Sequence, residues 1–477
     1  MSNEMMRKNR ILPREEMEKQ FGYIEKIKEI NMAFEIENGR RKRAFVHTFG
    51  CQQNEADSEK IAGVAVDMGY EITHTPDDAD LIMVNTCAIR EHAEKKALST
   101  IGQYKHLKAK NPNLMIGVCG CMVVQEHRKD DIKFRYPYVD FLFGTSSIHR
   151  FPELLYDKMT KGKRLYCPEE AEYLVAEGLK IHRECSYKAW VSIMYGCNNF
   201  CSYCIVPYVR GRERSREMSA ILDEVRTLTA NGCREITLLG QNVNSYAKDS
   251  EYDYDFADLI GEICRIDGDF RVRFMTSHPK DASDKLIDVM SENEKMARHF
   301  HLPLQSGSDE ILRRMNRHYD SATYLKKVEY MRQRMPDITL TTDIIVGFPG
   351  ESEEDFEATL NMLREVEYDM IYSFIYSPRK GTPAYDMEQV PDEVKSERFS
   401  RLLALQNEIS LRKNQPLVGK TLRVLCDGPS KNNDEVYSGR TDGNKIVFFD
   451  ALPSDEGEFL DIKINRAEAF ALYGEKI

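Results

Sequence analysis

Three cysteines within eight positions constrain this chain more than any other feature of its sequence. Cys197, Cys201 and Cys204 lie in a loop that follows a strand-like run at residues 189–193. A cubane iron–sulfur cluster has four irons and normally takes four thiolates, so three cysteines leave one iron open. An open coordination position is typical of reactive metal centres rather than structural ones. The spacing therefore predicts a reactive cluster.

A zinc site completed by a distant Cys or His is the alternative interpretation of this triplet. Zinc ligands usually occur as two paired halves, such as two CxxC motifs. No matching second half lies near residues 197–204, so the pattern favours the iron–sulfur cluster.

Three further cysteines each follow a predicted strand nearer the N-terminus. Alternating strand and helix patterns predict a doubly wound α/β domain at residues 44–160, with strands at 44–49, 71–73, 81–85 and 115–118. The carboxyl ends of parallel strands meet at one edge of a sheet. Cys51, Cys87 and Cys121 would emerge there and form a second three-thiolate site. Cys119, two residues from Cys121, is an alternative third ligand.

The middle of the chain predicts a partial (β/α)6 barrel. Six strands are expected at 189–193, 235–239, 271–274, 299–302, 339–345 and 370–376. The loops after barrel strands form the working face of such folds. An amphipathic helix from Pro391 to about Lys413 is expected to strap the barrel and to complete a domain at 183–413.

The motifs around the six cysteines resemble those of a known family. The triplet at 197–204 matches the CxxxCxxC signature of radical S-adenosylmethionine (SAM) enzymes. Thr48 to Asn54, Asn85 to Cys87 and Gly120-Cys121 resemble the N-terminal domain of the methylthiotransferases within that superfamily. The resemblance selects Cys121 rather than Cys119. It implies two [4Fe-4S] clusters, with SAM both as the source of a 5′-deoxyadenosyl radical and as the methyl donor.

The same resemblance suggests which residues contact SAM. Gly240 and Gln241 stand where the superfamily binds the methionine amino group, and Tyr203 is the aromatic residue before the last cluster cysteine. Val346 belongs to the apolar strand that packs against adenine. Ser277, Gln305 and Asp343 are candidates for polar contacts to SAM, although Gln305 and Asp343 could instead orient the substrate.

A basic segment directly after the cysteine loop is a candidate for substrate binding. It contains one aromatic residue and four arginines: Tyr208, Arg210, Arg212, Arg214 and Arg216. Arginines beside an aromatic ring can hold phosphates and stack on a base. For any single arginine, an ordinary surface ion pair is the alternative.

The last residues, 414–477, predict a small β-barrel that resembles the TRAM domain, an RNA-binding module. They contain eight Lys and Arg against eleven Asp and Glu. An RNA-facing side must therefore be built from a few residues such as Lys431, Arg440 and Lys445.

Composition limits the compartment and the partners. The net charge of −11 means that RNA contacts must come from local basic patches. Twelve cysteines favour a reducing cytoplasm, and no apolar run is long enough for a membrane span. The first 43 residues are a charged N-terminal extension, expected to be partly helical or mobile.

The resemblance as a whole implies a tRNA-modifying enzyme. It is greatest to the branch that converts N6-isopentenyladenosine, next to the anticodon in the tRNA anticodon stem-loop, to its 2-methylthio derivative by C2–H abstraction, sulfur insertion and methyl transfer. An electron donor such as flavodoxin or ferredoxin is implied. The alternatives are methylthiolation of N6-threonylcarbamoyladenosine in tRNA or of a ribosomal-protein aspartate and, outside this class, a non-catalytic RNA-binding iron–sulfur scaffold or sensor.

Overall fold

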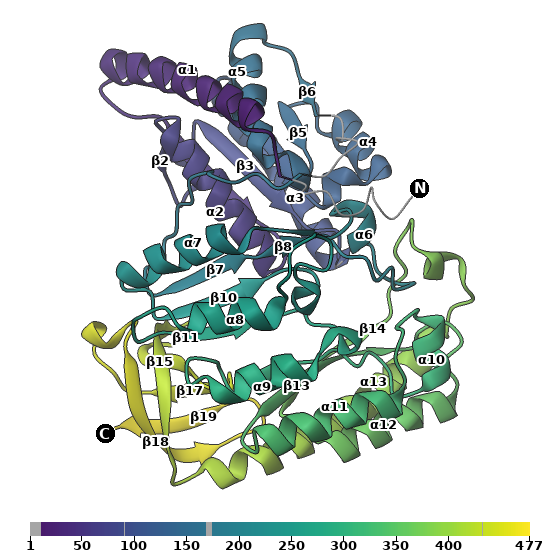
Figure 1. Ribbon diagram of the computed structural model, residues 1–477. Helices are drawn as coiled ribbons and strands as arrows, with labels where there is room; N and C mark the ends of the chain where they lie inside the picture. Colours follow the sequence, from purple (N-terminus) through teal and green to yellow (C-terminus); the bar gives the residue numbers. More distant parts are fainter. Residues whose placement is uncertain (1–10, 90, 168–173, 432) are drawn as a thin grey trace.

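The chain folds into three parts that follow one another along the sequence (Figure 1). The computed structural model describes residues 11–89, 91–167, 174–431 and 433–477. The N-terminal α/β domain lies at one end of the molecule, a partial barrel follows, and a small closed β-barrel packs against the side of the partial barrel away from the N-terminal domain. None of the helices in the described ranges combines the length and apolar character that a membrane span requires.

The N-terminal domain is a doubly wound α/β domain, as predicted. Its six parallel strands lie in the order β2-β1-β3-β4-β5-β6: β1 (Arg43–Thr48), β2 (Glu71–Ile72), β3 (Leu81–Thr86), β4 (Met115–Gly120), β5 (Phe141–Phe143) and β6 (Leu165–Tyr166). Apolar side chains of α1 (Arg14–Asn38), α2 (Gln52–Asp67) and α5 (Phe151–Lys161) cover one face of the sheet. Those of α3 (Glu91–Lys110) and α4 (Glu126–Arg135) cover the other.

Most of the described part of the N-terminal extension is the 25-residue helix α1. Met17, Ile24 and Ile27 are buried, and Tyr23 packs on Tyr156 of α5 with ring centroids 5.4 Å apart. Burial of this apolar stripe accounts for the docking of a helix whose other faces are charged. The extension is therefore part of the N-terminal domain. Residues 1–10 lie outside the described ranges.

The central domain contains the six predicted parallel strands. They form two three-stranded halves, β11-β10-β7 and β12-β13-β14: β7 (Lys188–Ser192), β10 (Glu235–Leu239), β11 (Arg271–Phe274), β12 (His299–His301), β13 (Thr339–Val346) and β14 (Met370–Ile375). Along the chain, the first five of these strands are followed in turn by α7 (Met218–Ala230), α8 (Phe256–Cys264), α9 (Asp284–Glu292), the pair α10 (Asp309–Arg314) and α11 (Ser321–Arg334), and α12 (Glu353–Val366).

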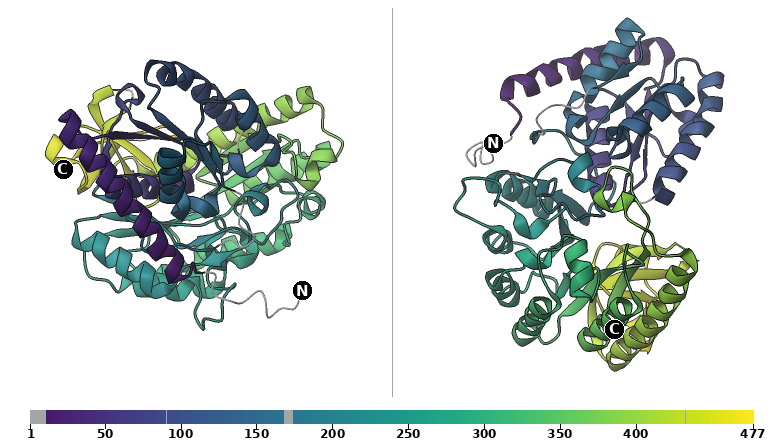
Figure 2. Two further views of the ribbon diagram at one scale, coloured as in Figure 1. Left: turned by 90° about the horizontal axis from the view of Figure 1, so that it is seen from above. Right: turned by 90° about the vertical axis from the view of Figure 1, so that its right-hand side faces the viewer.

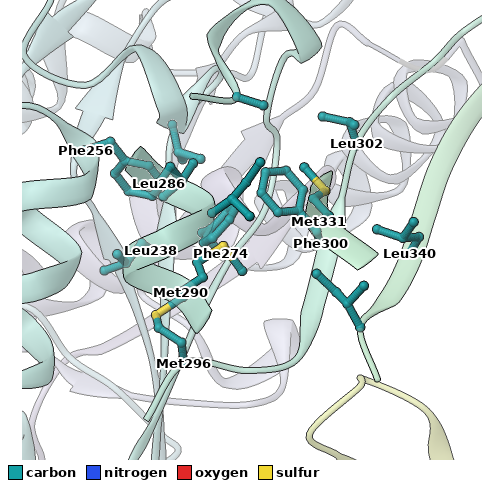
Figure 3. Packing of buried hydrophobic residues seen from close by; sticks show 14 of the residues in the cluster. Leu238, Phe256, Phe274, Leu286, Met290, Met296, Phe300, Leu302, Met331 and Leu340 are labelled. Atoms are coloured by element: carbon teal, nitrogen blue, oxygen red, sulfur yellow. The ribbon is translucent and has the colours of Figure 1, made fainter. Parts of the chain in front are cut away.

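Aromatic packing joins the two halves where β11 meets β12. Phe274 of β11 lies edge-on to Phe300 of β12 and to Phe256 of α8, with ring centroids 5.1 and 5.2 Å apart (Figure 3). Leu286 and Met290 of α9 belong to the same buried cluster. The core therefore continues across the boundary between the halves and makes them one partial barrel.

The C-terminal part straps and closes one end of this barrel. Helix α13 (Asp392–Asn414) contributes the buried Leu402 and Ile409 to the main core. The closed β-barrel follows, formed by β15 (Thr421–Ser430), β16 (Asn433–Thr441), β17 (Ile446–Phe449), β18 (Phe459–Ala467) and β19 (Leu472–Lys476). It docks at the amino ends of the barrel strands, where Arg273 donates to the carbonyl of Asp442 at 2.9 Å (Figure 2). The carboxyl ends face the N-terminal domain instead.

Candidate functional site

The three N-terminal cysteines lie together at one edge of the sheet. Strands β1, β3 and β4 are neighbours, and Cys51, Cys87 and Cys121 follow their carboxyl ends. Burial raises the pKa of the Cys121 thiol to about 12; Arg210 acts in the opposite direction, and the nearby Cys87 and Cys51 add to the rise. The structure thus brings together the three side chains that the sequence singled out.

Two asparagines tie the three loops to one another. The Asn54 amide donates to Asn85 Oδ1 at 3.1 Å and to the Thr86 carbonyl at 3.2 Å. Asn85 donates in turn to the Asn54 carbonyl at 2.8 Å, and the Cys121 N–H donates to the Thr86 carbonyl at 2.8 Å. Because these polar groups satisfy one another inside the protein, they hold the backbone of all three cysteines in one arrangement.

Cys119 lies within the sheet rather than at its edge. It is a residue of β4, paired with Asn85 and Phe143, and it is buried in the apolar cluster that contains Phe141. Its surroundings are those of a small apolar core residue, which favours Cys121 as the third ligand.

The second cysteine set lies in the loop between β8 (Met194–Tyr195) and α6 (Val206–Val209). Burial raises the pKa of Cys197 to about 12, and burial together with the Cys201 and Cys197 charges raises that of Cys204. The loop is fastened to the barrel, because Ser202 donates to two carbonyls at the end of α10: its N–H to Met315 at 3.0 Å and its hydroxyl to Arg314 at 2.8 Å.

Each cysteine set offers three thiols, and thiolates are the usual ligands of iron–sulfur clusters. No three His, Cys, Asp or Glu side chains within the described ranges gather closely enough to surround one metal ion. In a cubane each thiolate binds a different iron, so the cysteines stand farther apart than the ligands of one ion. Burial raises the pKa of Cys121 and of Cys197, and metal coordination would favour the deprotonated form of these thiols.

A glycine before the second set is required by its surroundings. Gly196 has φ +77°, and a Cβ there would lie 2.1 Å from the Arg212 carbonyl oxygen. That carbonyl also accepts a hydrogen bond from Arg214 at 3.0 Å. The backbones on both sides of the cysteine loop therefore approach each other too closely for any side chain at residue 196.

We expect Gly196→Ala to lower the thermal unfolding midpoint more than Gly232→Ala does. Gly232 also has a positive φ, +88°, but a Cβ there would meet no atom within 4 Å. Its substitution costs only backbone strain, about 1 kcal/mol, whereas Gly196→Ala adds a backbone clash. Differential scanning calorimetry of the two variants measures the difference. Equal shifts would contradict the close approach.

The residues expected to contact SAM lie at the carboxyl ends of the barrel strands. Gln241, after β10, accepts the Gly196 N–H through Oε1 at 2.5 Å and so supports the cysteine loop directly. A Cβ on Gly240 would lie 2.7 Å from Met194 Cγ. Tyr203 packs edge-on to Phe348, with ring centroids 6.4 Å apart. Val346 is buried in the main core.

The three polar candidates lie on the same rim. The Ser277 hydroxyl donates to the His301 carbonyl, and the Gln305 N–H donates to the Asp343 carbonyl at 2.8 Å. The Asp343 carboxylate is 3.6 Å from His301 Nε2, with 28% of its side chain exposed. Of the three side chains, that of Asp343 is the most open to a ligand.

The basic segment divides into exposed and buried residues, which corrects part of the prediction. Arg210, Arg214 and Arg216 are buried. Arg210 pairs with Asp57 at 2.8 Å, and Arg216 with Glu177 and Glu224 at 2.7 Å each. Arg214 donates to the Arg210 carbonyl at 2.8 Å. Internal partners already use these guanidinium groups, so only the exposed Tyr208 and Arg212 can meet a substrate.

The predicted basic residues of the C-terminal barrel are also mostly engaged. Lys445 pairs with Asp369 at 2.8 Å and donates to Asn414 Oδ1 at 2.8 Å, which places it in the contact with the central domain. Arg440 donates to the Asn444 carbonyl at 3.1 Å. Lys431 is exposed and is the one of the three that can face RNA.

The two cysteine sets face each other across the contact between their domains. Cys121, Ala88 and Val124 share a buried apolar cluster with Ile205 and Val209, which follow Cys204 in the chain. Around this cluster, Gln53 donates to Ser192 Oγ at 2.9 Å and Thr145 to the Val209 carbonyl at 3.0 Å. One interface therefore holds both candidate metal sites.

Arg317 is a site residue that the sequence analysis missed. Its guanidinium is buried, donates through Nη1 to Cys201 Sγ at 3.4 Å and through Nη2 to the Pro303 carbonyl at 2.9 Å. It lies after α10, more than a hundred residues from the cysteine, and no motif marks it.

Comparisons with known proteins agree with this architecture. Residues 43–144 match the uncharacterized protein family UPF0004, residues 191–363 the radical SAM superfamily, and residues 415–477 the TRAM domain. The tRNA-2-methylthio-N(6)-dimethylallyladenosine synthase of Acetivibrio thermocellus is 50% identical over 469 residues, which are 98% of each chain. The enzyme of that name from Caldicellulosiruptor saccharolyticus is 51% identical over 456 residues, 95% of this chain and 97% of the relative.

Among solved structures, the chain is similar in fold to the radical SAM methyltransferase TsrM from Kitasatospora setae with cobalamin and a [4Fe-4S] cluster bound. The TM-score is 0.52 over 72% of this chain and 74% of TsrM, at 14% identity. At that identity the likeness concerns the fold alone.

Proposed function

The chain belongs to the family of tRNA-2-methylthio-N(6)-dimethylallyladenosine synthases, and from this premise we propose that its two cysteine sets hold two [4Fe-4S] clusters that act on one substrate. Cys197, Cys201 and Cys204 would hold the cluster that binds SAM, and Cys51, Cys87 and Cys121 the auxiliary cluster. The activity is that of a radical SAM tRNA methylthiotransferase, which adds a methylthio group to adenosine carrying the dimethylallyl, or isopentenyl, group on N6.

The observation that carries the proposal of two clusters is the shared interface of the two cysteine sets. Cys121 packs against Ile205 and Val209 of the SAM-cluster loop, so both metal sites can approach one bound adenine. When bound, the clusters and SAM supply the radical that breaks the C2–H bond, together with the sulfur and the methyl group that replace hydrogen. A side-chain base cannot remove an unactivated C–H proton near neutral pH.

The protein residues bind and orient these groups. Three thiolates in each set leave one iron free for a ligand. Gly240, Gln241, Ser277, Gln305 and Asp343 surround the rim where SAM would lie, with Tyr203 and Val346 supporting it from the core side. Gln241 couples the rim to the cluster loop through Gly196.

Exposed Tyr208 and Arg212 would bind the tRNA anticodon stem-loop. The Arg212 guanidinium lies 4.2 Å from the centroid of the Phe200 ring, which holds it at the surface next to the SAM cluster. A flavodoxin- or ferredoxin-type donor would reduce that cluster, and the reaction would take place in the cytoplasm, where thiols stay reduced.

Anaerobic assay of the reconstituted protein tests the activity. With dithionite, SAM and an anticodon stem-loop that carries N6-dimethylallyladenosine, we expect 5′-deoxyadenosine and the 2-methylthio nucleoside by mass spectrometry. If the protein turns over only RNA that carries threonylcarbamoyl-adenosine, or only a ribosomal protein, the proposed substrate is wrong. Absence of 5′-deoxyadenosine would overturn the radical chemistry itself.

We expect Arg317→Lys to make the reduction potential of the SAM cluster more negative. Hydrogen bonds to cluster sulfurs raise the potential because they stabilise the more negative, reduced cluster. Lysine keeps the positive charge but loses the planar fork that reaches both Cys201 and Pro303. An EPR-monitored redox titration in the absence of SAM measures the change. An unchanged potential would mean that the N–H···S contact has no electronic role.

A further inference from the structure

The inner face of the barrel half β12-β13-β14 carries side chains to which the proposed metal and SAM sites assign no role. Along β13, Leu340, Ile344 and Val346 point outward into the main core (Figure 3 shows Leu340). Side chains alternate between the two faces of a strand, so Thr341, Asp343 and Ile345 point inward. On β14 their direct partners are Met370, Tyr372 and Phe374.

This inner face changes character along the strands. Toward the amino ends it is polar, since Thr341 Oγ1 contacts His301 Nδ1 at 3.0 Å and the His301 ring lies 5.6 Å from that of Tyr372. Toward the carboxyl ends it is apolar, with Ile345 and Phe374 side by side. Phe374 is 37% exposed, so part of its apolar surface is accessible to a ligand.

The apolar end of this face lies beside the loop of the second cysteine set, and the segment after β14 contacts the N-terminal domain. Ile345 and Tyr203, which lies between Cys201 and Cys204, pack against the same small buried cluster. After the end of β14, the Ser377 hydroxyl donates to Glu91 Oε2 at 3.4 Å, and Glu91 begins α3 four residues after Cys87. Phe374 is therefore on a strand that reaches from one cysteine set toward the other.

We propose that Phe374, together with Ile345, forms the apolar subsite that receives the dimethylallyl group of the substrate adenosine. The inference rests on the proposed function, which requires this adenine to lie between the two cysteine sets. The five-carbon group is the one apolar feature that distinguishes the modified adenosine from an ordinary one. An exposed aromatic ring next to an aliphatic side chain removes such a group from water. Asp343, which precedes Ile345 by two residues on β13 and lies on the same face, borders the subsite.

Binding of two RNAs by the anaerobic holoenzyme tests the subsite. The RNAs are identical anticodon stem-loops with either adenosine or N6-dimethylallyladenosine at the target position, and fluorescence anisotropy gives the dissociation constants. We expect Phe374→Ala to weaken binding of the dimethylallyl RNA about 10- to 100-fold and to leave binding of the adenosine RNA unchanged. Phe374→Leu should recover part of the preference, because leucine keeps an apolar surface.

Ile375→Ala is the matched control. Ile375 is the next residue of β14, is equally exposed at 40%, and pairs with Val346 on the opposite face. It should keep the wild-type preference, and iron content should be the same in all variants. Loss of the preference in Ile375→Ala, or its retention in Phe374→Ala, would overturn the inference.

The design separates this inference from the proposed function. If the unsubstituted holoenzyme does not methylthiolate the dimethylallyl RNA, the proposed function itself fails. If it does so while Phe374→Ala discriminates between the RNAs as the wild type does, only the subsite is wrong. A Phe374→Ala variant that keeps the RNA preference but is reduced more slowly by flavodoxin would also overturn it, in favour of a protein contact.

Discussion

A variant in which alanine replaces Cys51, Cys87 and Cys121 is expected to hold about four irons and four sulfides per chain after anaerobic reconstitution, against about eight of each in the unsubstituted chain. We assign the three thiols to one site because they follow the carboxyl ends of the adjacent strands β1, β3 and β4. The other site is built from a different loop, which is fastened to the barrel by Ser202. Loss of the first site should therefore leave the second intact.

The same variant is expected to lose all methylthio product but to keep releasing 5′-deoxyadenosine from SAM. Under the proposed assignment, radical formation would need only the Cys197, Cys201 and Cys204 site, whereas sulfur insertion would need the auxiliary site. Iron and sulfide analysis, Mössbauer spectroscopy and mass spectrometry of the nucleosides measure the two losses separately. The amount of methylthio product should fall below the detection limit rather than decrease partially.

Cys119→Ala is the matched control for this variant. Cys119 is two residues from Cys121 and is buried among apolar side chains, so its substitution should keep about eight irons and the methylthio product. Four irons in Cys119→Ala would mean that this thiol is the third ligand. Zinc in either site, or loss of all iron from the triple variant, would contradict the assignment of two independent clusters.

The strands that carry the site could be predicted from the sequence because they are short runs that are either mostly apolar or alternate polar and apolar residues, with polar or glycine residues after them. The strands predicted at 235–239 and 271–274 coincide with β10 and β11 at both ends. Cysteines placed directly after such runs come together once the strands pair in parallel, as β1, β3 and β4 do. Local patterns thus determine which loops share an edge.

The burial of Arg210 and Arg216 could not be predicted because each has an acidic partner that is distant in the sequence. Asp57, the partner of Arg210, is 153 residues away, and Glu177, the partner of Arg216, is 39 residues away. A basic segment that pairs internally has the same composition as one that binds RNA. The role of Asn85 could have been predicted, because an amide side chain at the end of the buried strand Leu81–Thr86 needs hydrogen-bond partners inside the protein.

The buried pair between Asp57 of α2 and Arg210 should be the most sensitive contact between the N-terminal and central domains. Both side chains are nearly inaccessible, with 3% and 4% exposed, at an N–O distance of 2.8 Å. Burial acts to lower the pKa of Arg210, but Cys121, Asp57 and Cys51 together raise it above its usual range, so the guanidinium stays charged. Asp57→Asn leaves that charge without its carboxylate.

We expect Asp57→Asn to lower the free energy of unfolding by about 3–5 kcal/mol, the usual cost of leaving one buried charge of a pair uncompensated. Asp67→Asn on the same helix is the matched control. Asp67 pairs with Lys180, also at 2.8 Å, but the two side chains are 34% and 50% exposed, so the loss should be below about 1 kcal/mol. Urea unfolding followed by circular dichroism compares the two.

The double variant Asp57→Leu/Arg210→Met separates the cost of an unpaired charge from the loss of the pair itself. Apolar side chains of similar volume remove both charges, and such replacements of buried pairs are often neutral for stability. We therefore expect the double variant to unfold close to the unsubstituted chain. If it is as unstable as Asp57→Asn, the pair contributes attraction that apolar packing does not replace. If Asp57→Asn costs no more than Asp67→Asn, Asp57 and Arg210 are not the contact that joins the two cysteine sites.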